Sequence, residues 1–438
     1  MNIIRCSSYQ YRWNIITTTT YQPLIIRKWL STVTSTTTTT TSSSTTTTTT
    51  SDSGSSPRTT PYSDKHYQPI ISEGFAGFDK LIIPKDFQAP NQELTVDPKS
   101  IKQQQLQSIV ESFKGPIEVS IGYGSGILPQ NGYSSTDTSD SDSSSISTTS
   151  STNGTQLDFI HLVKNSQQFH QQNLKQFPEH YSFKSLSLIK LIQGNGIYFN
   201  PYVTINNHSI KYGIISLKSA FSDLCEWNSF YFAGRLQKPV NILLDHDIRL
   251  KFLNQYNLKT AMTVAIFILD KREFNEFDLY KTITQLSYLG DFRMYIGGEN
   301  PNKIDNIVVK QYDYFKHLYE PILQYFIKNN YLVIVDNNQE NRIFRKNLPN
   351  NYKIKLLSGL PLGFRQNLYK HYYEKSIKEI ANDDKLGQNM IKVITKIIQI
   401  SSIKQAIKGI FTAGLIKSLK YALAKQIKFW KGKLNKKG

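Results

Sequence analysis

The stretch Gly122-Tyr123-Gly124-Ser125-Gly126 decides how the rest of the chain is interpreted. The residues just before it, Ile117-Glu118-Val119-Ser120-Ile121, have the composition of a short β-strand, and Leu157-Asp158-Phe159-Ile160 opens a second apolar run. A glycine turn lets backbone N–H groups approach phosphate oxygens, and a nearby carboxylate suits Mg²⁺, which prefers oxygen ligands. The pattern predicts a site for phosphate and a metal ion, although Gly-Ser-Gly by itself also fits an ordinary turn.

Composition narrows the classes of protein that fit. The chain has 438 residues and a formal net charge of +19, which favours an acidic partner such as nucleic acid, anionic lipid or a phosphorylated substrate. Its two cysteines, Cys6 and Cys225, lie far apart and support neither a disulfide framework nor a zinc site. The longest apolar run in the body, Ala261 to Leu269, is shorter than the roughly 20 residues that a membrane span needs. We therefore expect a soluble or peripheral protein.

Two segments are not expected to contribute to the fold. Residues 1–60 are rich in Ser and Thr and contain arginines but no carboxylate before Asp52, which is typical of a mitochondrial or plastid transit peptide. A disordered low-complexity tail is the alternative for this segment. A second Ser/Thr-rich tract, residues 134–151, separates the glycine stretch from Asp158 and is predicted to be a solvated insertion without a function.

Hydrophobic periodicity divides the body into two parts. Residues 90–235 are predicted to form a helix-flanked sheet of four or five strands. Residues 236–310 are predicted to be winged-helix-like, with three helices at 247–256, 259–269 and 276–288 and a two-stranded wing at 292–296 and 304–310. Nucleic-acid binding is not expected of this unit, because the middle helix is apolar on nearly all sides and lacks side chains that read base edges. Residues 311–400 are predicted to be mostly helical, and no chemistry is assigned to them.

The C-terminal segment, residues 401–438, contains ten lysines and no acidic residue. From Leu415 on, helical spacing puts Leu419, Leu423, Ile427 and Trp430 on one face and lysines on the other. This pattern is typical of a helix that lies on anionic lipid. A solvated helix docked on its own domain is the alternative.

Together these residues resemble the mitochondrial translocator assembly and maintenance proteins, which are mitochondrial phosphatidate cytidylyltransferases. The glycine stretch and Leu157-Asp158-Phe159-Ile160 are the first two of seven segments that carry the resemblance in order. The other five are His180-Tyr181-Ser182, Lys211-Tyr212-Gly213, Ala233-Gly234-Arg235-Leu236-Gln237-Lys238-Pro239, Leu286-Ser287-Tyr288 with Gly290-Asp291-Phe292-Arg293-Met294, and Lys408-Gly409-Ile410-Phe411-Thr412-Ala413-Gly414.

The resemblance implies an α/β nucleotidyltransferase-fold domain, a winged-helix-like second domain and a C-terminal amphipathic helix that attaches to the membrane. It implies the Mg²⁺-dependent reaction of CTP with phosphatidate to give CDP-diacylglycerol and pyrophosphate. It also implies a peripheral location on the matrix side of the mitochondrial inner membrane, where the product feeds cardiolipin synthesis. CTP, phosphatidate and anionic lipid are then the expected partners, with no nucleic acid among them.

Candidate site residues follow from matching this chemistry to the motifs. Gly124, Ser125 and Gly126 are expected to hold the triphosphate, and Asp158 the Mg²⁺. Further residues are expected to neutralise phosphate charge or to line the nucleotide or lipid pocket. The charge-neutralising candidates are Lys211, Arg235, Lys238 and Arg293, and the pocket candidates are His180, Tyr181 and Ser182. Asp158, Ser125 and Lys238 are the predicted catalytic residues.

One departure concerns the metal. Nucleotidyltransferases of this fold commonly have a second carboxylate two residues after the first, where this chain has Ile160. The second ligand would then be Asp291 or Asp247, or one metal ion suffices. Two other functions remain open, namely a non-catalytic inner-membrane assembly factor for protein import, and a nucleotidyltransferase that acts on RNA or protein. The oligomeric state is not predicted.

Overall fold

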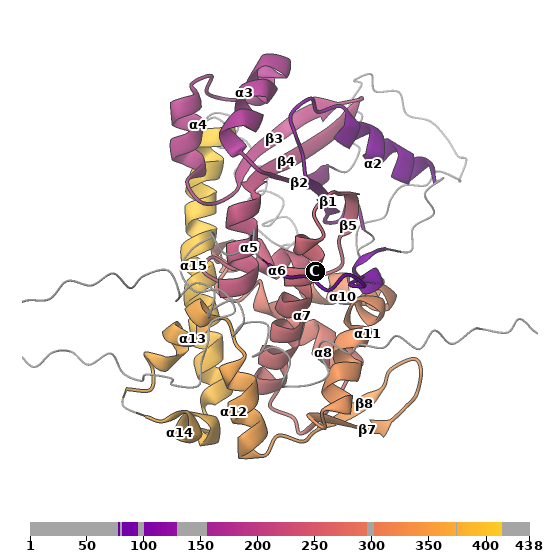
Figure 1. The fold of residues 1–438 in the computed structure, drawn as a ribbon, viewed down its shortest axis with the longest axis vertical. Helices are drawn as coiled ribbons and strands as arrows, with labels where there is room; N and C mark the ends of the chain where they lie inside the picture. The colour runs from indigo at the N-terminus through magenta and orange to yellow at the C-terminus, as the bar shows by residue number, and fades with distance from the viewer. Residues whose placement is uncertain are drawn as a thin grey trace, which may run out of the picture.

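The computed structural model describes residues 78, 81–94, 100–128, 156–295, 302–373 and 375–413. Figure 1 shows a sheet at one end of the molecule, helices at the other, and the long helix α15 (Leu386–Ala413) running along one side between them. The expected transit peptide at 1–60, the insertion at 134–151 and the part of the C-terminal segment from 414 on lie outside the described residues.

A mixed five-stranded sheet forms the first part, which confirms the expected α/β class. Its strand order is β3-β4-β2-β1-β5, with β2 parallel to β4 and the other neighbours antiparallel. The strands are β1 (Val119–Tyr123), β2 (Leu157–Val163), β3 (Tyr198–Ile205), β4 (His208–Ser216) and β5 (Asn241–Asp245). The edge strand β5 comes from beyond residue 235, so the sheet extends past the boundary predicted from the sequence.

Alternation along the strands gives the sheet two buried faces. On β2, Phe159 and Val163 pack into a core beneath α2 (Ile101–Glu111) and α3 (Ser166–Gln176), whereas Ile160 and Leu162 pack on the other face, which α5 (Leu217–Glu226) covers. Side-chain caps begin these three helices: Ser100, Asn165 and Ser216 each accept a backbone N–H of the first turn. Two shorter helical segments, η4 (Pro178–His180) and α4 (Leu186–Gln193), complete this part, whereas η3 (Pro90–Gln92) packs against the helical part.

The helical part differs from the prediction at its centre. The two helices expected at 247–256 and 259–269 are one helix, α7 (Arg249–Ile268). The polar residues that suggested a turn are buried in contacts from other elements instead, because Asn257 accepts a hydrogen bond from Trp227 Nε1 and donates to the Ala233 carbonyl. The third expected helix is confirmed as α8 (Glu276–Leu286).

The two wing strands predicted at 292–296 and 304–310 are wrong. The described residues of the two stretches fall in α9 (Phe292–Tyr295) and α10 (Lys303–Lys310), and residue 296 lies outside the described residues. In α10, Ile307 and Val308 form the buried side, while Asp305 in the first turn and Lys310 in the last complement the helix dipole. A three-stranded antiparallel sheet of order β6-β8-β7 lies elsewhere, in β6 (Glu273–Asn275), β7 (Leu332–Asp336) and β8 (Ile343–Lys346).

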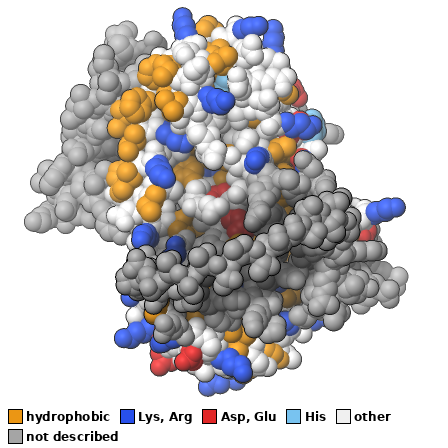
Figure 2. All heavy atoms as spheres, turned by 60° about the vertical axis from the view of Figure 1, so that its left-hand side comes forward, with side chains coloured by type: hydrophobic (Ala, Val, Ile, Leu, Met, Phe, Trp, Pro, Cys, Tyr) orange, Lys and Arg blue, Asp and Glu red, His pale blue; other side chains and the backbone are white. Residues whose placement is uncertain are grey.

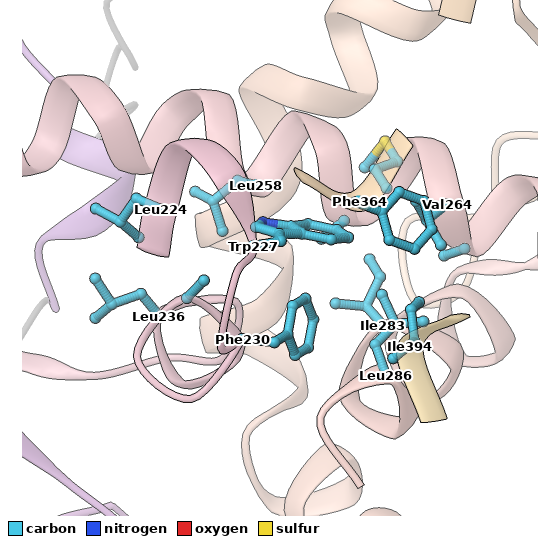
Figure 3. Packing of buried hydrophobic residues seen from close by; sticks show 14 of the residues in the cluster. Leu224, Trp227, Phe230, Leu236, Leu258, Val264, Ile283, Leu286, Phe364 and Ile394 are labelled. Carbon is cyan, nitrogen blue, oxygen red and sulfur yellow. The ribbon is translucent and has the colours of Figure 1, made fainter. Parts of the chain in front are cut away.

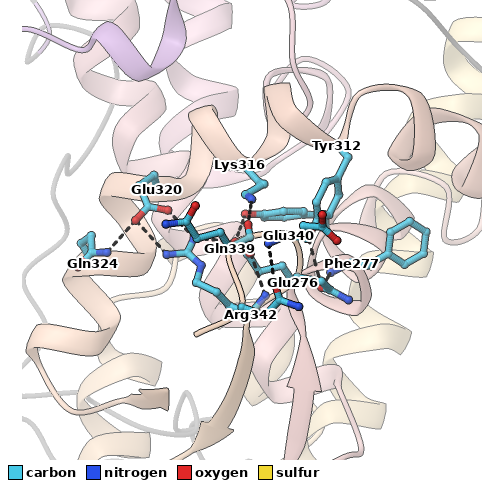
Figure 4. A network of polar contacts seen from close by, with 12 residues as sticks. Glu276, Phe277, Tyr312, Lys316, Glu320, Gln324, Gln339, Glu340 and Arg342 are labelled. Atoms are coloured by element: carbon cyan, nitrogen blue, oxygen red, sulfur yellow. Dashed lines mark hydrogen bonds and ion pairs between the residues drawn. The ribbon is translucent and has the colours of Figure 1, made fainter. Parts of the chain in front are cut away.

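A polar network fastens this small sheet to its helices. Arg342, the residue just before β8, donates to Glu276 of α8 at 2.7 Å and also pairs with Glu320 of α11 (Tyr312–Lys328) (Figure 4). Glu276 is fully buried and accepts a second bond from the Tyr280 hydroxyl at 2.9 Å. A buried carboxylate is tolerated only when its charge is paired and hydrogen-bonded, as it is here.

One hydrophobic core joins the sheet to the helices. It includes Trp227 after α5, Phe230 before α6 (Ala233–Leu236), and side chains from α7, α8 and α15 (Figure 3). Phe364 of α13 (Leu362–Tyr369) packs edge-on against the Trp227 ring. The remaining helices are α12 (Asn350–Ser358) and α14 (Ile377–Asn382). Within the part of the chain that the structure describes, no helix is long and apolar enough to cross a membrane.

Candidate active site

Three neighbouring strands bring a tyrosine, an aspartate and a lysine into one row. Tyr123 of β1 pairs with Asp158 of β2, and Asp158 pairs with Lys211 of β4. Paired residues point to the same side of a sheet, so the three side chains share a face at one end of the strands. Lys211 Nζ lies 3.4 Å from Asp158 Oδ1 and 4.6 Å from the centre of the Phe199 ring. Burial acts to lower the pKa of Lys211, but the Asp158 carboxylate and nearby tyrosines raise it above its ordinary value.

The glycine turn begins where β1 ends. Gly124 has a φ of +82°, and its carbonyl accepts the N–H groups of Ile127 and Leu128, which closes one tight turn around the partly exposed Ser125. A Cβ at Gly124 would lie 3.2 Å from Asp158 Oδ2, and one at Gly126 would lie 2.4 Å from the Gln156 carbonyl oxygen. Glycine is therefore required at both positions for the turn to pack against the start of β2.

Substitution of Gly126 by alanine tests this packing. Because its Cβ would overlap the Gln156 backbone oxygen, the turn must move away from β2. We expect catalytic turnover to fall at least about tenfold, since small displacements of positioning groups are costly. Gly359→Ala is the matched control, because the nearest atom to a Cβ there is 3.5 Å away. Steady-state kinetics of both variants gives the answer, and unchanged activity in Gly126→Ala would show that the turn does not position substrate.

Arg235 brings a second cation to the Tyr123 end of the row, whereas Lys211 lies at the other end. The guanidinium carbon of this α6 residue lies 4.0 Å from the centre of the Tyr123 ring and 5.5 Å from that of Tyr231. Burial acts to lower the pKa of Arg235, but the two tyrosines and Asp158 raise it. Burial also raises the pKa of Tyr123, so its ring is a neutral stacking surface. The cluster thus holds one carboxylate beside two cations.

Lys238 lies next to this cluster, just after α6. Its ammonium donates to the Ser287 hydroxyl at 2.6 Å and to the Gly234 carbonyl, and it lies 5.6 Å from the Tyr288 ring centre. Burial and the neighbouring Arg235 charge lower the pKa of Lys238 to about 7. A lysine in this state gains a proton readily when an anion binds beside it.

The carboxylates offered as further metal ligands are each paired with an arginine. Asp291 forms a bidentate pair with Arg293, with a closest distance of 2.6 Å, so these two predicted site residues bind each other. Asp247 pairs with Arg249 after β5, and that end of β5 is paired with Val119, at the other end of β1 from Tyr123. Among the described residues, no group of three His, Cys, Asp or Glu side chains is placed to hold a metal ion. Asp158 is therefore the carboxylate that the site itself offers.

His180, Tyr181 and Ser182 lie in a different place. The His180 Nδ1 is 2.9 Å from the hydroxyl of Tyr212, which faces the opposite side of the sheet from its neighbour Lys211. Tyr181 joins the same buried polar group through Asn173, and Ser182 donates to the Thr412 carbonyl in α15 at 2.6 Å. These residues connect the sheet to α3 and α15 and do not belong to the Asp158 cluster.

Several residues of the cluster were not assigned roles from the sequence. Tyr123 was part of the quoted glycine stretch but was not recognised as the ring on which Arg235 stacks. Phe199 and Tyr231 were missed, and Ser287 was quoted within a motif but was given no role. Alternation along β1 could have placed Tyr123 on the core face, but the other contacts depend on how distant segments pack.

The site combines a glycine turn, one carboxylate and two cations on one face of the sheet in a mixed α/β fold. This combination is typical of the class of proteins that bind phosphorylated substrates. Comparison with known families agrees with this class. A family model described as "Phosphatidate cytidylyltransferase, mitochondrial" matches residues 106–428. The chain belongs to this family of nucleotidyltransferases, as the sequence motifs predicted.

Individual relatives cover most of the chain. A Saccharomyces cerevisiae protein of the same description is 38% identical over 346 residues, which is 77% of this chain and 73% of the yeast protein. The Schizosaccharomyces pombe protein is 37% identical, over 78% of this chain and 87% of its own length. The Mus musculus protein is 34% identical, over 76% of this chain and 96% of its own length.

Proposed function

We propose that this chain catalyses the reaction of CTP with phosphatidate to give CDP-diacylglycerol and pyrophosphate in the mitochondrion, and so supplies cardiolipin synthesis. A phosphatidate oxygen forms a bond to the α-phosphorus of CTP, and the bond from that phosphorus to the oxygen bridging the α- and β-phosphates breaks. The observation that carries the proposal is the Asp158 carboxylate beside Lys211 and the glycine turn, on the face where Arg235 stacks.

The charge and position of each residue indicate its role in the reaction. The attacking phosphate is already anionic, so positioning and charge neutralisation carry most of the rate enhancement. Gly124, Ser125 and Gly126 would bind the triphosphate through backbone N–H groups and the Ser125 hydroxyl. Lys211, Arg235 and Lys238 would balance the charge that develops on the leaving pyrophosphate. Four predicted site residues would act outside the Asp158 cluster, either by binding phosphatidate or by holding α15 in place. They are Arg293, His180, Tyr181 and Ser182.

Asp158 is suited to hold Mg²⁺. Its Oδ1 is buried and accepts no hydrogen bond from the described residues, and it lies in a longer ion pair with Lys211 at 3.4 Å, so this oxygen keeps acceptor capacity for a cation. Mg²⁺ commonly binds through one or two carboxylates, with substrate phosphates and water as the other ligands, and a single aspartate meets that need. When bound, the ion supplies charge neutralisation between phosphates. Asp291 is proposed as a second ligand, and its ion pair with Arg293 would have to break before it could bind the ion.

The proposal is tested with purified protein, CTP, Mg²⁺ and phosphatidate vesicles, with CDP-diacylglycerol detected directly by mass spectrometry. Pyrophosphate release must match the lipid product one for one. RNA and a protein mixture offered with CTP serve as the alternative acceptors. Transfer to either of these without lipid product would favour the RNA- or protein-directed enzyme. A folded protein that binds no CTP would favour a non-catalytic assembly factor.

The lowered pKa of Lys238 predicts a pH dependence of CTP binding. Lys238 loses its charge as pH rises through about 7, so the affinity for CTP should fall towards the tenfold-per-unit limit at higher pH. The Lys238→Arg protein keeps the positive charge over this pH range, so its affinity for CTP should change little with pH. Calorimetric titration of both proteins at several pH values measures the difference. The same pH profile in both proteins would assign the titration to another group.

We further propose that the two parts of the fold are a nucleotidyltransferase-type sheet and a winged-helix-like unit. The second assignment is supported by the element order α7, β6, α8, α9, α10, α11, β7, β8 and by the sheet order β6-β8-β7. In this assignment the wing is the β7–β8 pair, well beyond the residue 310 boundary predicted from the sequence. The apolar core contacts of α7 with α8 and α15 argue that this helix is structural, which fits the expectation of no nucleic-acid partner.

A peripheral attachment to the matrix side of the inner membrane, through the basic C-terminal segment 401–438, is also proposed. The described end of α15 supports it, because Ile400, Ile403, Ile407 and Phe411 are 42–51% exposed on one stripe that also carries Lys404. On the same face, Leu188 and Leu191 of α4 are exposed, and Lys408 of α15 donates to the Gln193 carbonyl at the end of α4. Figure 2 shows hydrophobic side chains gathered in a row on this face, among Lys and Arg.

A double substitution on α4 tests this membrane-facing surface without touching the C-terminal segment. Leu188→Ser with Leu191→Ser should weaken binding to cardiolipin-containing vesicles at least about tenfold, since burying each leucine in lipid is worth more than 1 kcal/mol. Ile101→Ser with Val333→Ser removes two exposed apolar side chains from α2 and β7 and should bind as the wild type does. Co-sedimentation at moderate salt separates the pairs, and equal binding of both would place the membrane contact elsewhere.

A further inference from the structure

A single buried carboxylate organises the loop that leads into α6. Asp223 of α5 is 6% exposed and accepts five hydrogen bonds, of 2.8–3.0 Å, from the loop that follows its helix. Its Oδ1 accepts from the Ser229 N–H, the Ser229 hydroxyl and the Phe230 N–H, and its Oδ2 accepts from the Phe232 and Ala233 N–H groups. Hydrogen bonds to an ionised acceptor are stronger than neutral ones, so this carboxylate is a strong constraint on the loop.

The loop needs such a constraint because its backbone is unfavourable. Trp227 and Phe230 both have positive φ values, 53° and 57°, which are disfavoured for large side chains. The helix that follows, Ala233–Leu236, has only four residues and is too short to be stable by itself. Phe232 is the residue just before this helix and Ala233 is its first residue, so Oδ2 of Asp223 satisfies N–H groups that the helix leaves without partners.

The same short segment carries the cations of the proposed site. Arg235 lies within α6 and stacks on Tyr123 at 4.0 Å, Tyr231 lies in the loop, and Lys238 follows the helix. We propose that Asp223 is a positioning residue for phosphate binding: by fixing the loop it holds the Arg235 guanidinium over Tyr123, beside Asp158. This inference rests on the proposed function for its kinetic consequences, but not for its structural ones.

A double-mutant cycle tests whether Asp223 acts through Arg235. Asp223→Asn keeps the size of the side chain but turns one acceptor into an NH₂ group that faces N–H donors. In the wild-type background it should lower kcat/KM by about 10- to 100-fold, and in an Arg235→Ala background by less than about threefold. A purely structural role predicts the same loss in both backgrounds, and that result would overturn the proposal. Asp383→Asn, whose carboxylate accepts from Tyr372 and Lys385, is the matched control and should keep full activity.

Binding of inorganic pyrophosphate, measured by calorimetry on the same four proteins, separates this proposal from the proposed function. Coupling in pyrophosphate affinity without any CDP-diacylglycerol synthesis would retain the role of Asp223 and reject the activity. Synthesis by the wild type without coupling in either measurement would reject the role of Asp223. If Asp223→Asn does not fold, Ser229→Ala is the second variant, which removes the hydroxyl that donates to Oδ1 and accepts the Tyr231 N–H. Its smaller loss must likewise disappear in the Arg235→Ala background.

Discussion

Replacement of Asp158 by asparagine is expected to lower kcat by at least about 10²–10³-fold while the protein stays folded. Loss of one group aimed at developing charge typically costs that much, and here the group would also hold the metal ion. Asparagine keeps the size of the side chain, so the packing of the glycine turn beside it should not change. In the wild type Lys211 Nζ lies 3.4 Å from an Asp158 carboxylate oxygen, and the substitution removes this anionic partner. A modest fall in melting temperature should therefore accompany the loss of activity.

The measurement is single-turnover formation of CDP-diacylglycerol at saturating CTP, together with thermal unfolding followed by circular dichroism. Asp305→Asn is the control, because Asp305 forms an exposed pair with Lys281 on α8 and such pairs contribute little. Near-wild-type turnover in a folded Asp158→Asn protein would remove Asp158 from the site. Restoration of activity by raised Mg²⁺ or by Mn²⁺ would support its role as a metal ligand.

Replacement of Arg235 by alanine is expected to lower kcat/KM for CTP by about 10²-fold, because a desolvated cation beside the phosphates is lost. Arg235→Lys should recover only part of this loss, since an ammonium on a flexible chain cannot stack flat on Tyr123 as the guanidinium does. Arg345→Ala removes an exposed arginine paired with Glu273 and should leave the kinetics unchanged. Equal rates for Arg235→Lys and the wild type would show that only charge matters at this position.

The glycine stretch, residues 122–126, shows which structural features can be predicted from neighbouring residues alone. A strand, a turn that requires glycine and a carboxylate at the start of the next strand are all consequences of neighbouring residues, so they were predicted correctly. The order of the seven motifs was enough to predict the family. By contrast, strands were expected at 292–296 and 304–310, where the described residues 292–295 and 304–310 are helical, because periodicity in so few residues does not separate strand from helix.

What the sequence by itself determined is the α/β class, the glycine turn, the membership of the family and the candidate carboxylate Asp158, because each depends on spacing along the chain. Tertiary structure alone decided which of the predicted cations share a site. Lys211 joins Asp158 through the parallel pairing of β2 with β4, and Arg235 arrives through a loop that Asp223 holds in place. Arg293 was an equally good candidate by composition but is paired with Asp291. Charge and residue type are local properties, whereas the distance between two charges is set by the packing of elements far apart in the chain.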